Sequence, residues 1–280
     1  MNANGPGGVK AEKDIVFGRG GDTELRLDIL RPPAGSEKRT AVIHAFGGAY
    51  TRGSKEDGYL TRNAQRLAER GYVCVASAYR HAPGAKWPAQ IHDLKAAIRW
   101  TRANAGYLGV DADKIAIAGY SAGGQLALVC AGTAGMAELE GDGGSAGVSS
   151  AVAACLAYYP ARVWRGDEGP SSAIMPDDAS DGDYAATDPL TYAAPGFPPT
   201  IIFNGTADPF IEPNTRLYEA LQQAGVPAEL HLYAGMPHIF DLYPGFGEST
   251  SELCDLFLDR YVANPRVYEG FPRRQQAARA

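Results

Sequence analysis

Ser121, in the run Gly119 to Gly124 (GYSAGG), is the residue of this 280-residue chain best placed to act as a nucleophile. The apolar residues 114–118 before the run predict a buried strand, and residues 125–131 after it predict a helix. A serine in such a G-x-S-x-G turn is typical of a nucleophile elbow, where glycines permit a tight turn and close approach of a substrate. The alternative is a Gly/Ala-rich turn that carries an incidental serine, so residues elsewhere in the chain must distinguish the two.

A serine hydroxyl is a weak nucleophile at neutral pH, and it needs a base that is itself oriented by an acid. Asp208 follows the strand predicted over 200–204, and His238 follows the strand predicted over 228–233. Ligands bind at the carboxyl ends of the strands in an α/β sheet, which is where both residues fall. Two of the other histidines lie inside a predicted strand and a predicted helix. We therefore expect His238 to be the base and Asp208 the acid.

Each of these residues also has a plainer interpretation. Asp208 with Pro209 could form an ordinary turn, and His238 could be a loop histidine without a role. The order Ser121, Asp208, His238 is the order of the triad in α/β-hydrolases, which favours the catalytic interpretation.

Backbone amides are needed to bind the negative oxygen that forms when a serine attacks an ester. We expect one donor from Ala122 and two from Gly47 and Gly48, which follow the strand predicted over 40–45. Ala49 takes part if the register differs by one residue. A plain Gly-Gly turn is the alternative for this dipeptide.

The composition is that of a globular protein, with 45% hydrophobic and 21% charged residues. A net charge of −6 argues against a nucleic-acid partner, and no apolar run is long enough to span a membrane. Residues 1–8 lack the pattern of a secretory signal, so we expect a cytoplasmic protein. The four cysteines lie in apolar contexts without a C-x-x-C motif, which predicts core thiols rather than a disulfide or a metal site. We expect no cofactor.

Strands and helices alternate along the chain, which predicts an α/β fold. We expect a mainly parallel, twisted sheet of about eight strands, with helices on both faces and an antiparallel hairpin at one edge. Besides those already named, the predicted strands are 14–18, 23–30, 72–78 and 151–159, and the predicted helices are 57–70, 87–105, 213–224 and 249–261. Residues 1–280 are expected to form one domain.

Several segments have no regular pattern. We expect residues 1–12 to be a flexible N-terminus, 138–150 to be a loop and 263–280 to be a polar tail. Residues 160–197 are rich in Pro and Gly, and they predict an irregular excursion over the site. The acidic cluster from Asp177 to Asp183 within it is interpreted as a solvated loop rather than a metal site.

The sequence resembles the α/β-hydrolase carboxylesterases, near the hormone-sensitive-lipase-like and the acetyl-xylan and feruloyl esterase-like groups. The matching residues span much of the chain: Phe46 to Tyr50, Gly53-Ser54, Tyr79 to Pro83, Trp87-Pro88, Asp93, Ala96 to Trp100, Asp111 to Gly124, Asn204 to Asp208 and His238. The lipase-like group has a His-Gly-Gly-Gly run, and Phe46 stands here in place of its histidine. His44 is therefore expected to be structural. Ile239 stands where a glycine usually follows the catalytic histidine. Too few residues precede the first strand for the N-terminal cap of that group, so we expect no separate cap domain.

Together these features predict a serine carboxylesterase that acts on short-chain acyl esters, with acetylated and feruloylated sugars as candidate substrates. The side chains expected to line its substrate site are Tyr50, Trp164, Phe210, Ile239 and Phe240. The alternatives are a peptidase of the prolyl-oligopeptidase type and a ligand receptor that has the same fold but no activity. The expected partner is a small-molecule ester, and the sequence leaves a homodimer open.

Overall fold

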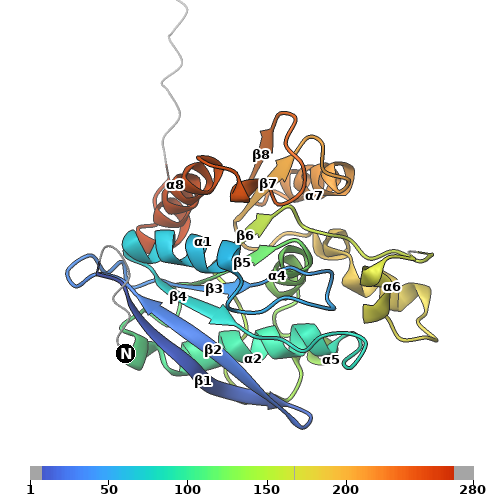
Figure 1. Ribbon diagram of the computed structural model, residues 1–280, viewed down its shortest axis with the longest axis horizontal. Coiled ribbons are helices and arrows are strands. Elements are labelled where there is room, and N and C mark those ends of the chain that lie inside the picture. Colours follow the sequence, from blue (N-terminus) through green and yellow to red (C-terminus); the bar gives the residue numbers. More distant parts are fainter. Residues whose placement is uncertain (1–7, 167, 268–280) are drawn as a thin grey trace, which may run out of the picture.

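A twisted sheet lies at the centre of the computed structural model, which describes residues 8–166 and 168–267 (Figure 1). The strands of this sheet, eight within the described residues, are β1 Lys10–Gly20, β2 Thr23–Arg31, β3 Ala41–Ala45, β4 Val73–Ser77, β5 Ile115–Tyr120, β6 Ala154–Tyr158, β7 Thr200–Gly205 and β8 Ala228–Tyr233. Their spatial order is β1-β2-β4-β3-β5-β6-β7-β8. The pairs β1·β2 and β2·β4 are antiparallel and the others are parallel. The predicted fold class is confirmed.

Helices cover both faces of the sheet, and this is why its inner strands are buried and mainly apolar. Every residue of β3, β4, β5, β6 and β7 is buried. The long helices are α1 Gly58–Glu69, α2 Ala89–Ala103, α4 Ala122–Gly132, α7 Ile211–Gln223 and α8 Phe246–Leu258. Helices α1 and α8 lie together on one face and α2 lies on the other, where it packs against α4 (Figure 1). Helix α7 packs against β7 and β8 at the far edge.

The shorter helical segments complete the connections. They are α3 Ala105–Leu108, α5 Ala137–Glu140, α6 Asp181–Thr187, η1 Pro170–Ile174, η2 Pro189–Tyr192, η3 Phe240–Leu242 and η4 Asp259–Ala263. The predicted long elements are all present, with ends that differ by a few residues.

The segment 160–197 is more regular than the irregular excursion that the sequence predicts. It contains the helix α6 between η1 and η2. The Ser180 hydroxyl accepts a hydrogen bond from the Asp183 amide (3.2 Å), and the Asp183 carboxylate accepts one from the Ser180 amide (2.7 Å). This reciprocal capping box begins α6, so local hydrogen bonds specify a helix whose hydrophobic periodicity is weak. Asp183, one residue of the acidic cluster, thus has a capping role.

The two chain ends also differ from prediction. Strand β1 begins at Lys10, where pairing with Arg31 of β2 fixes the backbone, so residues 10–12 are part of the sheet. At the other end, residue 263 is the last of η4 and not the first of a polar tail. The parts of these predictions that concern residues 1–7 and 268–280 lie outside the described residues.

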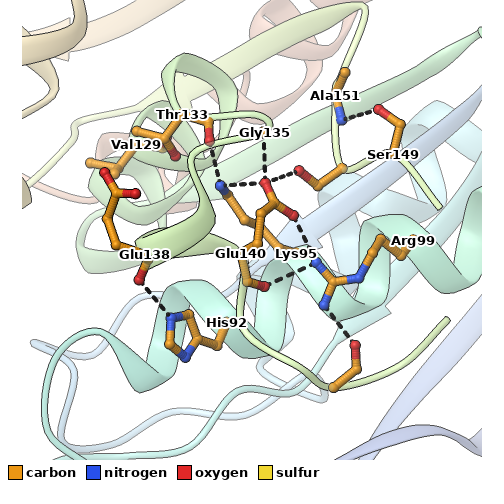
Figure 2. Close-up of polar contacts among 12 residues, drawn as sticks. His92, Lys95, Arg99, Val129, Thr133, Gly135, Glu138, Glu140, Ser149 and Ala151 are labelled. Atoms are coloured by element: carbon orange, nitrogen blue, oxygen red, sulfur yellow. Dashed lines mark hydrogen bonds and ion pairs between the residues drawn. The ribbon is translucent and has the colours of Figure 1, made fainter. Parts of the chain in front are cut away.

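A buried polar cluster ties α2 to the segment that follows α4 (Figure 2). The Lys95 ammonium donates to the Thr133 carbonyl (2.6 Å) and to the Glu140 carboxylate (2.9 Å), and Arg99 donates to the other oxygen of that carboxylate (2.9 Å). The Ser150 hydroxyl also donates to Glu140 (2.6 Å). Burying two cations is costly unless they are paired, and here both are. Because the predicted loop 138–150 supplies Glu140 from the end of α5, part of it is helical and anchored.

A further prediction about the framework is confirmed. The four cysteines are free and buried, as expected for core thiols. The Arg80 guanidinium makes a two-pronged ion pair with the buried Asp93 carboxylate, with N–O distances of 2.8 Å to each oxygen. No helix in the described residues is long and apolar enough to cross a membrane.

Candidate active site

Ser121 occupies the sharp turn between β5 and α4, and its backbone is in the left-handed region (φ 53°, ψ −118°). Such a conformation is strained for a residue with a Cβ and persists only where neighbouring groups hold it. The Ser121 amide donates to the Tyr158 carbonyl (2.9 Å), and the Ser121 carbonyl accepts from the Ala161 amide (3.0 Å). Gly123 is required beside it, because a Cβ there would lie 2.2 Å from the Phe46 carbonyl oxygen. The turn thus presents the serine side chain at the carboxyl end of β5.

His238 and Asp208 meet Ser121 although they are far from it in sequence. The distance from His238 Nε2 to Ser121 Oγ is 2.8 Å, and from His238 Nδ1 to Asp208 Oδ2 it is 2.7 Å. The second Asp208 oxygen accepts a hydrogen bond from the Phe210 amide (2.8 Å), so the carboxylate is held at both oxygens. When Nδ1–H donates to Asp208, Nε2 is left as an acceptor for the serine proton. This arrangement can deprotonate the Ser121 hydroxyl.

Aromatic rings surround the imidazole of His238. The Tyr159 ring meets it edge-on with 4.9 Å between ring centroids, and the Phe210 ring does so at 5.6 Å. These contacts restrict the ring and shield its hydrogen bonds from water, which strengthens them.

The loop after β3 supplies the candidate oxyanion donors, but not in the predicted register. The Gly47 amide donates to the Tyr59 hydroxyl (2.6 Å), so its position does not fit the expectation that it binds an oxyanion. Gly48 and Ala49 line the same cavity as Ser121. Among the described residues, neither their amides nor that of Ala122, the first residue of α4, have an acceptor.

A cavity of about 480 Å³ opens over Ser121 and His238. Of the side chains expected to bind substrate, Tyr50, Phe210 and Ile239 line it. Trp164 is not among its lining residues in the described part of the chain; its ring packs against Phe210 and is 45% exposed. Phe240 is fully buried, packs against the Tyr159 ring with 5.7 Å between centroids, and is likewise not among the lining residues in the described part of the chain.

Six further lining residues have no prediction from sequence: Arg52, Asp57, Tyr59, Tyr159, Ala161 and Ser171. Tyr159 is the last residue of a predicted strand, and this position at a carboxyl end is the one signal that could have indicated it. Tyr59 lies in the first turn of a predicted helix, where nothing in the local pattern marks it out. Burial raises the pKa of Tyr59, so its hydroxyl stays protonated near neutral pH.

His44 of β3 is fully buried and is not among the residues that line the cavity in the described part of the chain. Its Nδ1 lies 3.2 Å from the Tyr120 hydroxyl, and burial lowers the pKa of His44 to about 3. A neutral imidazole in the core agrees with the expected structural role. No cluster of His, Cys, Asp or Glu side chains that could hold a metal ion is found in the described residues.

A model of the BD-FAE family matches residues 27–221, which is more than half of the chain. The chain belongs to the BD-FAE family. This BD-FAE member is 33% identical to Esterase LipQ from Mycobacterium tuberculosis over 249 residues, or 82% of this chain and 57% of LipQ. It is 31% identical to a versiconal hemiacetal acetate esterase from Dothistroma septosporum, over 74% of this chain and 68% of that protein. The chain spans less than two thirds of the length of LipQ and of two further M. tuberculosis relatives, LipM and LipC.

Solved structures agree with this assignment. Apo esterase 2 from Thermogutta terrifontis superposes with a TM-score of 0.76 at 31% identity, covering 90% of this chain and 94% of that one. The same esterase phosphorylated by paraoxon gives a TM-score of 0.77 at 29% identity, with 93% and 97% covered. The predicted α/β-hydrolase fold and the resemblance to carboxylesterases are therefore confirmed for this BD-FAE member.

Proposed function

We propose that the chain is a serine carboxylesterase that hydrolyses short-chain acyl esters. The observation that carries this proposal is the continuous path of hydrogen bonds from Ser121 Oγ through His238 to Asp208, at the base of an open cavity. The esterase names of the relatives, and the paraoxon-phosphorylated state of the structural neighbour, support the same class of chemistry.

In this proposal His238 takes the proton of Ser121 as the serine oxygen attacks the ester carbonyl. Asp208 stabilises the imidazolium that forms and keeps Nδ1 protonated. His238 then gives its proton to the leaving alkoxide, and an acyl-enzyme remains on Ser121. A water molecule, deprotonated by the same imidazole, attacks the acyl-enzyme and releases the acid.

The negative oxygen of each tetrahedral intermediate needs donors that are not already bonded. We assign this role to the amides of Gly48, Ala49 and Ala122, because Gly47 is already bonded to Tyr59. The start of α4 also favours negative charge at this point, since the helix dipole and its free amides point toward it.

The alcohol and acyl groups on the two sides of the ester bond are less constrained than the reacting atoms. Tyr59, Tyr159 and Phe210 give the cavity aromatic walls, which support a sugar ring or an aromatic acyl group such as feruloyl. Acetylated and feruloylated sugars are therefore the substrates that we propose to test first. A homodimer and a cytoplasmic location stay predictions.

Turnover of p-nitrophenyl acetate, compared with that of a dipeptide anilide, tests the proposed class of reaction. An esterase hydrolyses the acetate, a peptidase prefers the anilide, and a receptor hydrolyses neither. Ser121→Ala should lower kcat by about 10⁴ to 10⁶ without unfolding the chain. Paraoxon should add one diethyl phosphoryl group to the wild type and to a Ser36→Ala control, but none to Ser121→Ala. A folded Ser121→Ala variant that keeps a tenth of the activity would disprove the role of this serine.

A further inference from the structure

One peptide unit of the loop after β3 is bonded to two tyrosine hydroxyls. The Tyr79 hydroxyl donates to the Phe46 carbonyl oxygen (2.9 Å), and the next amide along the chain, that of Gly47, donates to the Tyr59 hydroxyl (2.6 Å). These carbonyl and amide groups belong to the same peptide bond. Tyr59 comes from the first turn of α1, whereas Tyr79 lies two residues beyond β4. Two separate elements therefore hold the plane of this peptide.

The peptide leads directly into the candidate oxyanion donors. A peptide unit is planar, so rotating the one between Phe46 and Gly47 turns the chain that follows it, including the Gly48 and Ala49 amides. Gly48 has φ +119°, and as a glycine it gives the loop no stiffness of its own. Donors in an oxyanion hole must be fixed before the reaction, because their benefit depends on preorganisation. The stiffness must come from contacts around the loop.

Both hydroxyls are suited to hold the peptide in the same way at any pH near neutrality. Burial raises the pKa of Tyr79 and of Tyr59, so neither ionises near neutral pH. The two rings have separate packing partners: Tyr79 stacks on Phe46 with 4.1 Å between centroids, and Tyr59 meets Tyr120 edge-on at 5.4 Å. Replacing either tyrosine by phenylalanine therefore removes a hydrogen bond and leaves the ring in place.

We propose that Tyr59 and Tyr79 are positioning residues that clamp the peptide between Phe46 and Gly47, and so aim the Gly48 and Ala49 amides at the oxyanion. The inference rests on the proposed esterase function. The hydroxyls act through the loop and not on the substrate. Their loss should weaken binding of the tetrahedral intermediate and leave binding of the neutral ester nearly unchanged.

Tyr59→Phe, Tyr79→Phe and the control Tyr72→Phe test the clamp. Tyr72 is also buried, and its hydroxyl donates to the Asp255 carboxylate (2.8 Å) beside the amino end of β4, the edge of the sheet opposite the site. Each variant loses the hydrogen bonds of one tyrosine hydroxyl; the Tyr72 hydroxyl also lies 3.2 Å from the Asp255 carbonyl oxygen and accepts from the Lys38 ammonium (3.4 Å). The measurements are kcat and KM for p-nitrophenyl acetate, Ki for a short alkyl trifluoromethyl ketone, and Tm. The ketone forms an oxyanion on the serine and so reports on the oxyanion hole.

Tyr59→Phe and Tyr79→Phe should each lower kcat by about tenfold or more, with KM within about twofold of the wild type. The Ki for the ketone should rise by a similar factor. Tyr72→Phe should lower Tm and leave kcat and Ki unchanged. The two test variants act on the same peptide from opposite sides, so either one suffices if the other does not fold.

If Tyr59→Phe and Tyr79→Phe keep the wild-type kcat and Ki, the clamp is wrong and the proposed function stands. The same conclusion follows if these variants change KM alone. A wild-type chain without Ser121-dependent hydrolysis would instead overturn the proposed function, and the clamp with it.

Discussion

The hydroxyl of Tyr159 donates a 2.7 Å hydrogen bond to the carboxylate of Asp241. The other oxygen of that carboxylate accepts from the Asn63 amide (2.6 Å). Asp241 is only three residues beyond His238 in the chain, but it is engaged with Tyr159, whose ring packs against the imidazole. Asp208 contacts the imidazole itself. Two buried carboxylates thus lie near one histidine with different partners, and their roles can be separated by experiment.

Asp208→Asn should lower kcat by about 10⁴, because an amide favours the wrong tautomer of His238. Asp241→Asn is the matched control, since the same change is made at a buried carboxylate that does not contact the imidazole. It should leave kcat close to the wild-type value. Steady-state turnover of p-nitrophenyl acetate measures both. The reverse result, with activity lost at Asp241 and kept at Asp208, would transfer the acid role to Asp241.

The stability of the chain should carry a pH dependence that comes from Asp241. Burial raises the pKa of Asp241, although the hydrogen bonds from Tyr159 and Asn63 act in the opposite direction. The folded chain therefore holds a proton at pH values where the unfolded chain has already released it, which lowers the free energy of unfolding as the pH rises above about 4. The amide that Asp241→Asn introduces cannot ionise. The free energy of unfolding of this variant should therefore fall less than that of the wild type between about pH 4 and pH 7. Urea unfolding across this range measures both chains, and parallel curves would contradict the prediction.

Gly123→Ala should destabilise the fold and impair the oxyanion loop. The added Cβ would lie 2.2 Å from the Phe46 carbonyl oxygen and 2.3 Å from that of Ala45, both backbone atoms that cannot move independently. Overpacking of this kind costs about 1–3 kcal/mol. Gly106→Ala in α3 is the control, because nothing lies within 4 Å of its added Cβ and alanine is the better helix former by about 1 kcal/mol. In urea denaturation, Gly123→Ala should have a lower free energy of unfolding than the wild type, and Gly106→Ala a higher one.

Short acyl esters should be better substrates than long ones. Each enclosed methylene stabilises by about 0.8 kcal/mol, so a closed acyl pocket would favour long chains steeply. Ile239, at the cavity wall, is 37% exposed, which indicates a wall open to solvent. We expect kcat/KM to fall from acetyl or butyryl to octanoyl and longer p-nitrophenyl esters, each measured below its micelle limit. A maximum at decanoyl or above would mean that the segment 160–197 encloses an acyl chain.

The sequence by itself determined the fold class and the residues that meet at Ser121. Strands such as β5 are short apolar runs, and the order of strands and helices leaves few topologies. In a parallel sheet the carboxyl ends of strands share one edge, so residues that follow β5, β7 and β8 are brought together by topology alone. This is why Ser121, Asp208 and His238 could be selected before any distance was known.

The tertiary structure decided which groups near Ser121 are already bonded. The Gly47 amide is hydrogen-bonded to the Tyr59 hydroxyl, and the Asp241 carboxylate is hydrogen-bonded to the Tyr159 hydroxyl. Trp164 is not among the described residues that line the cavity. Helix α6 is a different case, because the capping bond of Asp183 that begins it is local in sequence. The weak hydrophobic periodicity of the segment nevertheless gave no indication of a helix. Hydrogen-bond partners such as Tyr159 and Asp241 are separated by 82 residues and meet only after helices dock on the sheet. Local periodicity and spacing encode elements and their order, whereas the pairing of side chains from different elements depends on how those elements pack.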